Sequence, residues 1–253
     1  MQLNSLLPIA INAAEEACKE ILDVYNSGDF QAEVKGDNSP LTIADKRAHH
    51  RIADILQSTN LPLLSEEGKT IPYEERKDWE YFWMVDPLDG TKEFLKRNGE
   101  FTVNIALIYK NKPVLGVVAV PVTGEVFYGA EGEGAFLKQN GKESKLETIK
   151  PIDLTSSGLR VVASRSHMNE DTENFIKDLK DPSLVSSGSS LKFMLLVNGK
   201  ADVYPRYAPT MEWDTAASHA VVNAAGIKVL QSNSREELVY NKENLLNPYF
   251  LCY

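Results

Sequence analysis

Two carboxylates follow one of the most apolar stretches of the chain. Residues 81–85 read YFWMV and lead directly into Asp86-Pro-Leu-Asp89-Gly-Thr. Burying a charged group is costly unless something pairs with it, so acids at the end of a buried strand need a partner. A simple turn explains this motif less well than a site does, because its lead-in is so apolar. We therefore place the centre of a candidate site here.

Three further acids occupy comparable positions. Glu66 follows a predicted strand in LLSEEG, Asp45 lies in the first turn of a predicted helix in SPLTIAD, and Asp214 opens a predicted helix in MEWDTAASHA. Each has a structural explanation of its own: a helix cap for Asp214, a turn for Asp45 and a solvated loop for Glu66. In combination, acids at strand ends and helix starts converge on one site. All-oxygen ligands with few His or Cys nearby suit Mg²⁺.

The Gly90-Thr91 pair adds a second property to the motif. Glycine lets backbone N–H groups approach a ligand, and a helix that begins at Thr91 presents its N-terminus to an anion. Metal-binding acids beside a phosphate cradle predict metal-assisted phosphoryl transfer. Haloacid-dehalogenase-type phosphatases offer a rival interpretation, in which the first acid is a covalent nucleophile. Their acids are separated by one residue and these by two, so we rank that interpretation lower.

Composition limits the classes of partner and compartment. The 253 residues carry a net charge of -9, which argues against non-specific binding of nucleic acid. Two cysteines indicate no disulfide framework and favour a reducing compartment. We expect no signal peptide, and the longest apolar run, residues 114–122, is too short to span a bilayer. We therefore expect a cytoplasmic protein, with peripheral association at the cytoplasmic face of the membrane left open.

Periodicity predicts an α+β half followed by an α/β half. Helices are expected over 5–25 and 42–57, followed by strands joined by tight turns, hence an antiparallel sheet. The expected strands cover 61–65, 81–86, 102–110, 114–121, 125–130 and 135–137. A polar stretch over 138–158 predicts a boundary between an N-terminal domain, 1–157, with most of the acids, and a C-terminal domain, 158–253, with Asp214. In the second domain we expect strands over 159–164, 184–186, 201–204 and 228–230, and helices over 169–179, 190–198 and 215–225.

The motifs resemble those of a known family over most of the chain. SPLTIAD, LSEEG, VDPLDGTKEF and EWDTAA together resemble the lithium-sensitive, magnesium-dependent phosphatases of the inositol monophosphatase superfamily. KRNGEFTVNIALI, ASRSH, GSSLKF, YPRYAPT and WDTAASHA resemble its CysQ branch, the 3′(2′),5′-bisphosphate nucleotidases. The resemblance implies the layered α-β-α-β-α sandwich of the sugar phosphatases. Ser218 stands where this branch often has glycine, and we expect a packing change there rather than a lost ligand.

The resemblance also implies a set of metal ligands. Glu66, Asp86 and the carbonyl of Leu88 would hold a first Mg²⁺, and Asp86, Asp89 and Asp214 a second. A third, weaker ion would be held by Glu66 and solvent.

Catalytic and phosphate-binding roles follow from the same comparison. Thr91, hydrogen-bonded to Asp45, would deprotonate or orient the attacking water, with Glu66 beside them. The amides of Gly90 and Thr91 would hold the reacting phosphate.

A second phosphate needs cations of its own, since the metals serve the first. Lys192 and Arg206 are the matching positions, with Ser189 and His167 as hydrogen-bond partners. An arginine fork and a lysine point charge suit a terminal phosphate. Without the resemblance, a solvated helix lysine, a surface-loop arginine and a histidine without a ligand explain Lys192, Arg206 and His167 better.

The expected function is a Mg²⁺-dependent phosphatase that removes the 3′-phosphate of adenosine 3′,5′-bisphosphate, by attack of water and without a covalent intermediate. The sulfated analogue is a further candidate substrate. The alternatives are an inositol or sugar monophosphatase of the same superfamily and a nucleotide-binding regulatory protein. The expected partner is a small nucleotide, with no nucleic acid, no integral membrane segment and no protein partner implied. Oligomeric state stays open.

Overall fold

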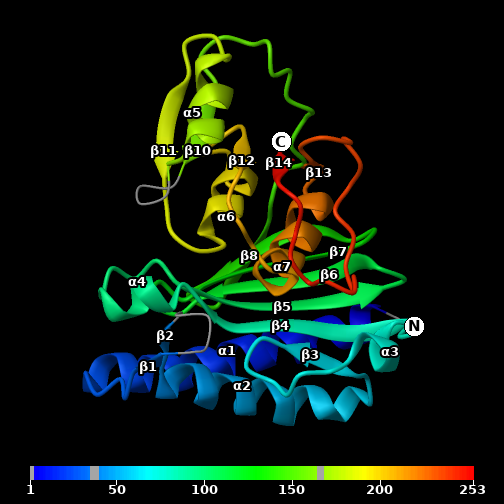
Figure 1. Ribbon diagram of the computed structural model, residues 1–253. Coiled ribbons are helices and arrows are strands. Elements are labelled where there is room, and N and C mark those ends of the chain that lie inside the picture. The colour runs from blue at the N-terminus through cyan, green and yellow to red at the C-terminus, as the bar shows by residue number, and fades with distance from the viewer. Residues whose placement is uncertain (1–2, 35–39, 164–167) are drawn as a thin grey trace.

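The computed structural model describes residues 3–34, 40–163 and 168–253, and it is built in layers (Figure 1). Helices α1 (Leu3–Ser27) and α2 (Ile43–Leu56) cover one face of a seven-stranded sheet. Helices α6 (Leu191–Val197) and α7 (Glu212–Ala224) cover the opposite face. Further strands and α5 (Glu170–Lys177) lie beyond them. This is the α-β-α-β-α arrangement that the resemblance implies.

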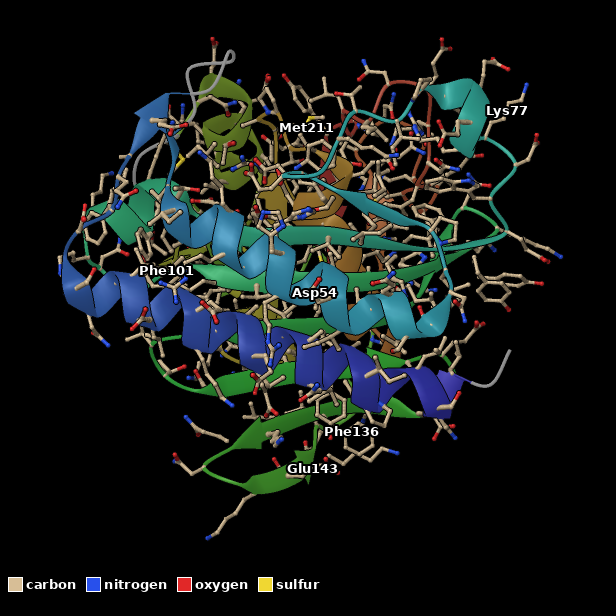
Figure 2. The ribbon with its side chains drawn as sticks, turned by 90° about the horizontal axis from the view of Figure 1, so that it is seen from below. Asp54, Lys77, Phe101, Phe136, Glu143 and Met211 are labelled. Atoms are coloured by element: carbon tan, nitrogen blue, oxygen red, sulfur yellow. The ribbon has the colours of Figure 1, made fainter. Side chains whose placement is uncertain are left out.

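The two N-terminal helices lie side by side across the sheet (Figure 2). On α1, residues buried at intervals of three and four form the stripe that faces the sheet, and four of them are alanines: Ala10, Ala13, Ala14 and Ala17. Helix α2 begins after Thr42, whose hydroxyl accepts a hydrogen bond from the Ala44 amide at 3.1 Å. Both predicted helices are confirmed, with ends that differ by one or two residues.

The sheet has the order β3-β4-β5-β6-β7-β8-β9. Its strands are β3 (Leu63–Ser65), β4 (Tyr81–Asp89), β5 (Thr102–Tyr109), β6 (Lys112–Val120), β7 (Glu125–Ala130), β8 (Gly134–Gln139) and β9 (Lys142–Lys145). The antiparallel prediction is correct from β4 to β9, although β9 was not predicted. It is wrong for β3, which pairs with β4 in parallel. The connection through residues 66–80, with the short helix α3 (Tyr73–Arg76), is long enough for the crossover that parallel strands need.

This parallel pair brings two of the acids together. Ser65 lies in register with Val85, so the next residues, Glu66 and Asp86, leave the same edge of the sheet. An antiparallel pairing would have put them at opposite ends of their strands.

The C-terminal part contains two smaller sheets. Strands β10 (Arg160–Ala163) and β11 (Ser183–Ser186) are parallel and are connected through α5. Strands β12 (Tyr204–Arg206), β14 (Phe250–Cys252) and β13 (Val229–Gln231) form an antiparallel sheet in that order. The strand expected over 201–204 begins three residues later and ends two residues later, and β14 was not predicted. The remaining elements are the pair β1 (Glu33–Val34) and β2 (Pro40–Leu41), a 3-10 helix over Gln57–Thr59, and α4 (Thr91–Leu95).

Helix α7 is seated directly on the sheet. A β-carbon at Gly116 of β6 would lie 2.1 Å from the carbonyl oxygen of Ala217, and one at Gly129 of β7 would lie 2.8 Å from the Ala224 side chain. The core beneath α7 combines Phe82 of β4 with residues of the C-terminal part. The division at 157/158 stays a prediction. Within the described ranges, no helix has the length and apolarity needed to cross a membrane.

Candidate metal and phosphate site

Three carboxylates meet beside the end of β3, the last third of β4 and the start of α7. Glu66 follows β3, Asp86 lies in β4 just before a register shift, and Asp214 is the third residue of α7. One oxygen from each lies within 4.8 Å of the others. The Leu88 amide donates to Asp86 Oδ1 at 3.0 Å, and the Met211 amide donates to Asp214 Oδ2 at 2.8 Å. The backbone thus fixes the orientation of two of the three carboxylates.

The electrostatics of this cluster call for a cation. Burial raises the pKa of Asp86 well above its usual range, and the charges of Glu66, Asp89 and Asp214 add to this effect. Burial, followed by the charge of Asp89, likewise raises the pKa of Asp214. Ionised carboxylates this close together are unfavourable without a positive charge between them. Because all the side-chain donors are oxygens, the residues present fit a hard divalent ion such as Mg²⁺.

Asp89 lies beside the cluster and is held by two serines. Its Oδ2 accepts hydrogen bonds from Ser189 Oγ at 2.6 Å and Ser190 Oγ at 3.0 Å. Ser189, predicted as a partner of the second phosphate, directs its hydroxyl to Asp89 in this structure. Sequence reasoning missed Ser190, although the paired serines of GSSLKF were a visible signal.

Thr91 and Asp45 come together as predicted. Gly90, with a φ of 93° in the left-handed region, precedes Thr91, the first residue of α4. The Thr91 hydroxyl lies 3.2 Å from Asp45 Oδ1 and 3.3 Å from the carbonyl oxygen of Leu88. Asp45 Oδ2 accepts from the amide and the hydroxyl of Thr42 at 2.8 and 2.6 Å. Asp45 is thus both a buried helix cap and the acceptor for Thr91.

A cleft of about 540 Å³ is lined by two of the candidate acids, Asp89 and Asp214, and by the two predicted cations. Asp89, Gly90 and Thr91 line one part of it, and Lys192 and Arg206 line another.

Neither cation is a simple surface residue. Lys192 is 8% exposed, and burial lowers the pKa of its ammonium to about 8. Arg206 lies in β12, where its Nη2 donates to the Pro209 carbonyl at 3.1 Å. Its Nε is buried without a hydrogen-bond partner among the residues described. His167 falls outside the described residues.

The sequence profile of the inositol monophosphatase family matches residues 2–249. The chain belongs to this family. It is 43% identical over 242 residues to the 3′(2′),5′-bisphosphate nucleotidase CysQ of Salmonella typhimurium, covering 94% of this chain and 95% of that protein. It is 42% identical over 253 residues to the CysQ nucleotidase of Escherichia coli K12, covering 98% of each. The crystal structure of CysQ from Bacteroides thetaiotaomicron superposes with a TM-score of 0.87 at 47% identity, covering 98% of this chain and 96% of that one.

Membership of the inositol monophosphatase family confirms the resemblance inferred from the motifs, and the similarity to three CysQ proteins confirms the branch. The family is metal-dependent, and the acidic cluster of this chain is suited to a metal.

Proposed function

We propose that this protein removes the 3′-phosphate of adenosine 3′,5′-bisphosphate, giving AMP and inorganic phosphate, with Mg²⁺ as the metal. One observation carries the proposal: a single cleft is lined by Asp89 and by Asp214, a member of the carboxylate cluster, and also by the buried Lys192 and by Arg206. A substrate with two phosphates could place one near the acids, where the metal would bind, and the other near the lysine and arginine. The nucleotidase names of the CysQ relatives support the same substrate class.

The acids would hold two to three ions. Glu66, Asp86 and the Leu88 carbonyl form one ligand set, and Asp86, Asp89 and Asp214 form another. When bound, Mg²⁺ neutralises charge on the phosphate and makes water nucleophilic at neutral pH.

Thr91 and Asp45 would direct the attacking water. Because the Thr91 hydroxyl donates its hydrogen to Asp45, its lone pairs remain available to accept a hydrogen from water. Burial keeps the Asp45 acceptor in place. Glu66 is the third member of the proposed catalytic set, and the amides of Gly90 and Thr91 would bind the reacting phosphate. Water attacks directly, and no carboxylate becomes phosphorylated.

Lys192 and Arg206 would bind the 5′-phosphate, with Ser189 and His167 beside them. Burial lowers the pKa of the Lys192 ammonium. A phosphate bound next to this ammonium would stabilise its charged form and so offset the effect of burial. The sulfated analogue carries the same 3′-phosphate and is a further proposed substrate. The cytoplasm is the proposed compartment.

The substrate is tested by comparing two nucleotides. Arg206→Ala and Lys192→Ala should each lower kcat/KM for adenosine 3′,5′-bisphosphate about ten- to a hundredfold, the usual cost of a lost charged donor. The values for 3′-AMP should barely change, because that nucleotide has no 5′-phosphate. Lys96→Ala is the matched control, since Lys96 also lines the cleft but follows α4, whereas Lys192 lies in α6 and Arg206 in β12. Equal losses with both nucleotides would contradict the assignment.

The metal is tested by chelation. Activity should disappear after exhaustive treatment with a chelator and return with Mg²⁺. Replacement of Mg²⁺ by Ca²⁺ should lower turnover, since Ca²⁺ accepts longer and looser coordination. From the resemblance, Li⁺ should inhibit. Full activity in the chelated protein would exclude the proposed ligand sets.

A further inference from the structure

Four polar side chains form a hydrogen-bonded network around Oδ2 of Asp89. Ser189 and Ser190 contact Asp89 Oδ2 directly, Thr102 Oγ1 lies 2.8 Å from Ser189 Oγ, and Asn104 Nδ2 donates to Ser190 Oγ at 3.0 Å. We call Thr102, Asn104, Ser189 and Ser190 the Asp89 network.

The network joins two parts of the chain. Thr102 and Asn104 belong to β5, where they lie in register with Asp89 and Asp86 of β4. Ser189 and Ser190 come 85 or more residues later, just before α6. Thr102, Asn104 and Ser190 are at most 2% exposed. Polar groups this deeply buried are costly unless they are paired, so we infer that these residues are present for the hydrogen bonds they make.

The direction of each hydrogen bond follows from counting hydrogens. An ionised carboxylate only accepts, so each serine uses its single hydrogen toward Asp89. The Thr102 hydroxyl lies 2.8 Å from Ser189 Oγ and 3.2 Å from Asn104 Oδ1, and we assign its single hydrogen to the shorter contact, with Ser189 as acceptor. The Asn104 amide is the donor to Ser190. Two chains of donors, Thr102 to Ser189 and Asn104 to Ser190, therefore end on the same carboxylate oxygen. Donors to a charged acceptor form the stronger class of hydrogen bond.

We propose that Asn104 and Ser190 are positioning residues for Asp89 as a metal ligand. They hold Oδ2 against the protein, prevent rotation of the carboxylate and leave Oδ1 for the cation. Ser190 Oγ also lies 3.1 Å from the backbone carbonyl oxygen of Asp214, so the same hydroxyl relates Asp89 to the start of α7. Asn104 is buried, is not among the residues that line the cleft, and acts through Ser190. This inference rests on the proposed metal dependence.

The test measures metal binding without turnover. Mn²⁺ serves as the probe, and its free concentration is followed by electron paramagnetic resonance in the absence of nucleotide. Ser190→Ala should weaken Mn²⁺ binding about ten- to a hundredfold, as loss of a group that orients a ligand typically does. Asn104→Leu, which keeps the side-chain shape, should weaken it in the same direction.

The matched control is Ser218→Ala on α7. Ser218 is fully buried and, within the described residues, its hydroxyl has no hydrogen-bond partner. It lies one helical turn beyond Asp214, so the change is also close to the ligands. Mn²⁺ affinity should not change in this variant.

The double variant separates positioning from a general effect on folding. If Asn104 acts through Ser190, Asn104→Leu should add less than about twofold in the Ser190→Ala background, within the scatter of independent effects. Full additivity would overturn the proposed action of Asn104 through Ser190.

Unchanged Mn²⁺ affinity in Ser190→Ala would overturn the proposal as well, while leaving the metal-dependent function intact. Absence of Mn²⁺ binding by the unmodified protein would overturn both. If Ser190→Ala fails to fold, Ser190→Cys, which keeps a weak donor, should still bind Mn²⁺ more weakly than the unmodified protein.

Discussion

Asp45 performs two tasks with two oxygens. Oδ2 closes the capping box of α2 with Thr42, and Oδ1 accepts from Thr91. A structural role at the start of α2 and the predicted role as partner of Thr91 are therefore compatible in the same side chain. Substituting Asp45 changes both tasks at once, so its partner is the cleaner place to test the chemistry.

Thr91→Val should lower kcat about 10²- to 10⁴-fold, the usual contribution of a positioned proton acceptor. Valine matches the shape of threonine but has no oxygen to orient water. Thr91→Ser restores the hydroxyl and should recover most of the turnover. Steady-state phosphate release and a urea titration would be measured on each variant. Turnover in Thr91→Val equal to that of the unmodified protein would exclude the proposed role.

At the scale of elements, α7 controls the site because it carries Asp214 against the sheet. The same helix carries a buried histidine, His219, about one and a half turns beyond Asp214. His219 Nδ1 lies 2.9 Å from the Tyr240 hydroxyl, and burial lowers the pKa of the imidazole to about 4. Glu237 opposes this shift and Lys228 adds to it.

This histidine predicts a loss of stability in mild acid. The unfolded chain takes up the proton near pH 6.5 and the folded chain only near 4, so the free energy of unfolding falls as pH drops through that window. The loss should reach about 3 kcal/mol at pH 4. His219→Gln removes the titrating group, so between pH 7 and pH 4 the free energy of unfolding of this variant should fall by about 3 kcal/mol less than that of the unmodified protein. Urea unfolding between pH 7 and 4 measures it, and parallel curves for the two proteins would contradict the prediction.

Gly116 supports the same helix from the sheet side. A β-carbon there would lie 2.1 Å from the Ala217 carbonyl oxygen and 2.9 Å from its carbon, both backbone atoms that cannot move alone. Gly116→Ala should therefore cost about 3 kcal/mol or more. Gly141→Ala is the control: its φ of 72° is unfavourable for alanine, but no atom lies within 4 Å, so the cost should be only about 1–2 kcal/mol. Equal losses of unfolding free energy in the two variants would show that α7 can shift.

Across the whole molecule, a buried arginine joins the chain after Glu66 to its C-terminal segment. Arg76 Nη1 donates to Asn241 Oδ1 at 2.7 Å and to the Lys242 carbonyl at 2.8 Å, and Nη2 donates to the Glu243 carbonyl at 3.0 Å. Glu212, two residues before Asp214, accepts from the Asn241 amide at 2.6 Å. This arrangement fixes the α3 segment relative to the start of α7.

Arg76→Met should lower the free energy of unfolding by about 3 kcal/mol, because buried acceptors lose their donor. Arg51→Met is the matched control. Arg51 pairs with Glu16 at 2.7 Å, but its side chain is 43% exposed, so the loss there should stay below about 1 kcal/mol. Urea titrations would compare the two. A small loss in Arg76→Met would mean that the C-terminal segment is held by other contacts.

The features predicted from sequence are those that local pattern determines. The period of α1, the helix start at Thr91 and the acids at element ends all follow from neighbouring residues. The parallel pairing of β3 was missed because strand direction depends on the path of residues 66–80. The contact between Arg76 and Asn241 spans 165 positions, and Asn104 meets Ser190 across 86, so no local pattern indicates either.

The order of elements along the chain has a consequence for synthesis. The large sheet is complete at Lys145, whereas α7, which covers its second face, begins at Glu212 after 66 further residues, 146 to 211. At about 5–20 residues per second, ribosomes need roughly 3 to 13 s for that interval. Meanwhile Phe82, Met84 and Val118, which the finished protein buries on the α7 side, have no helix to cover them. The nascent chain is therefore most prone to aggregate in the seconds before α7 emerges, and this is when a chaperone would have most effect.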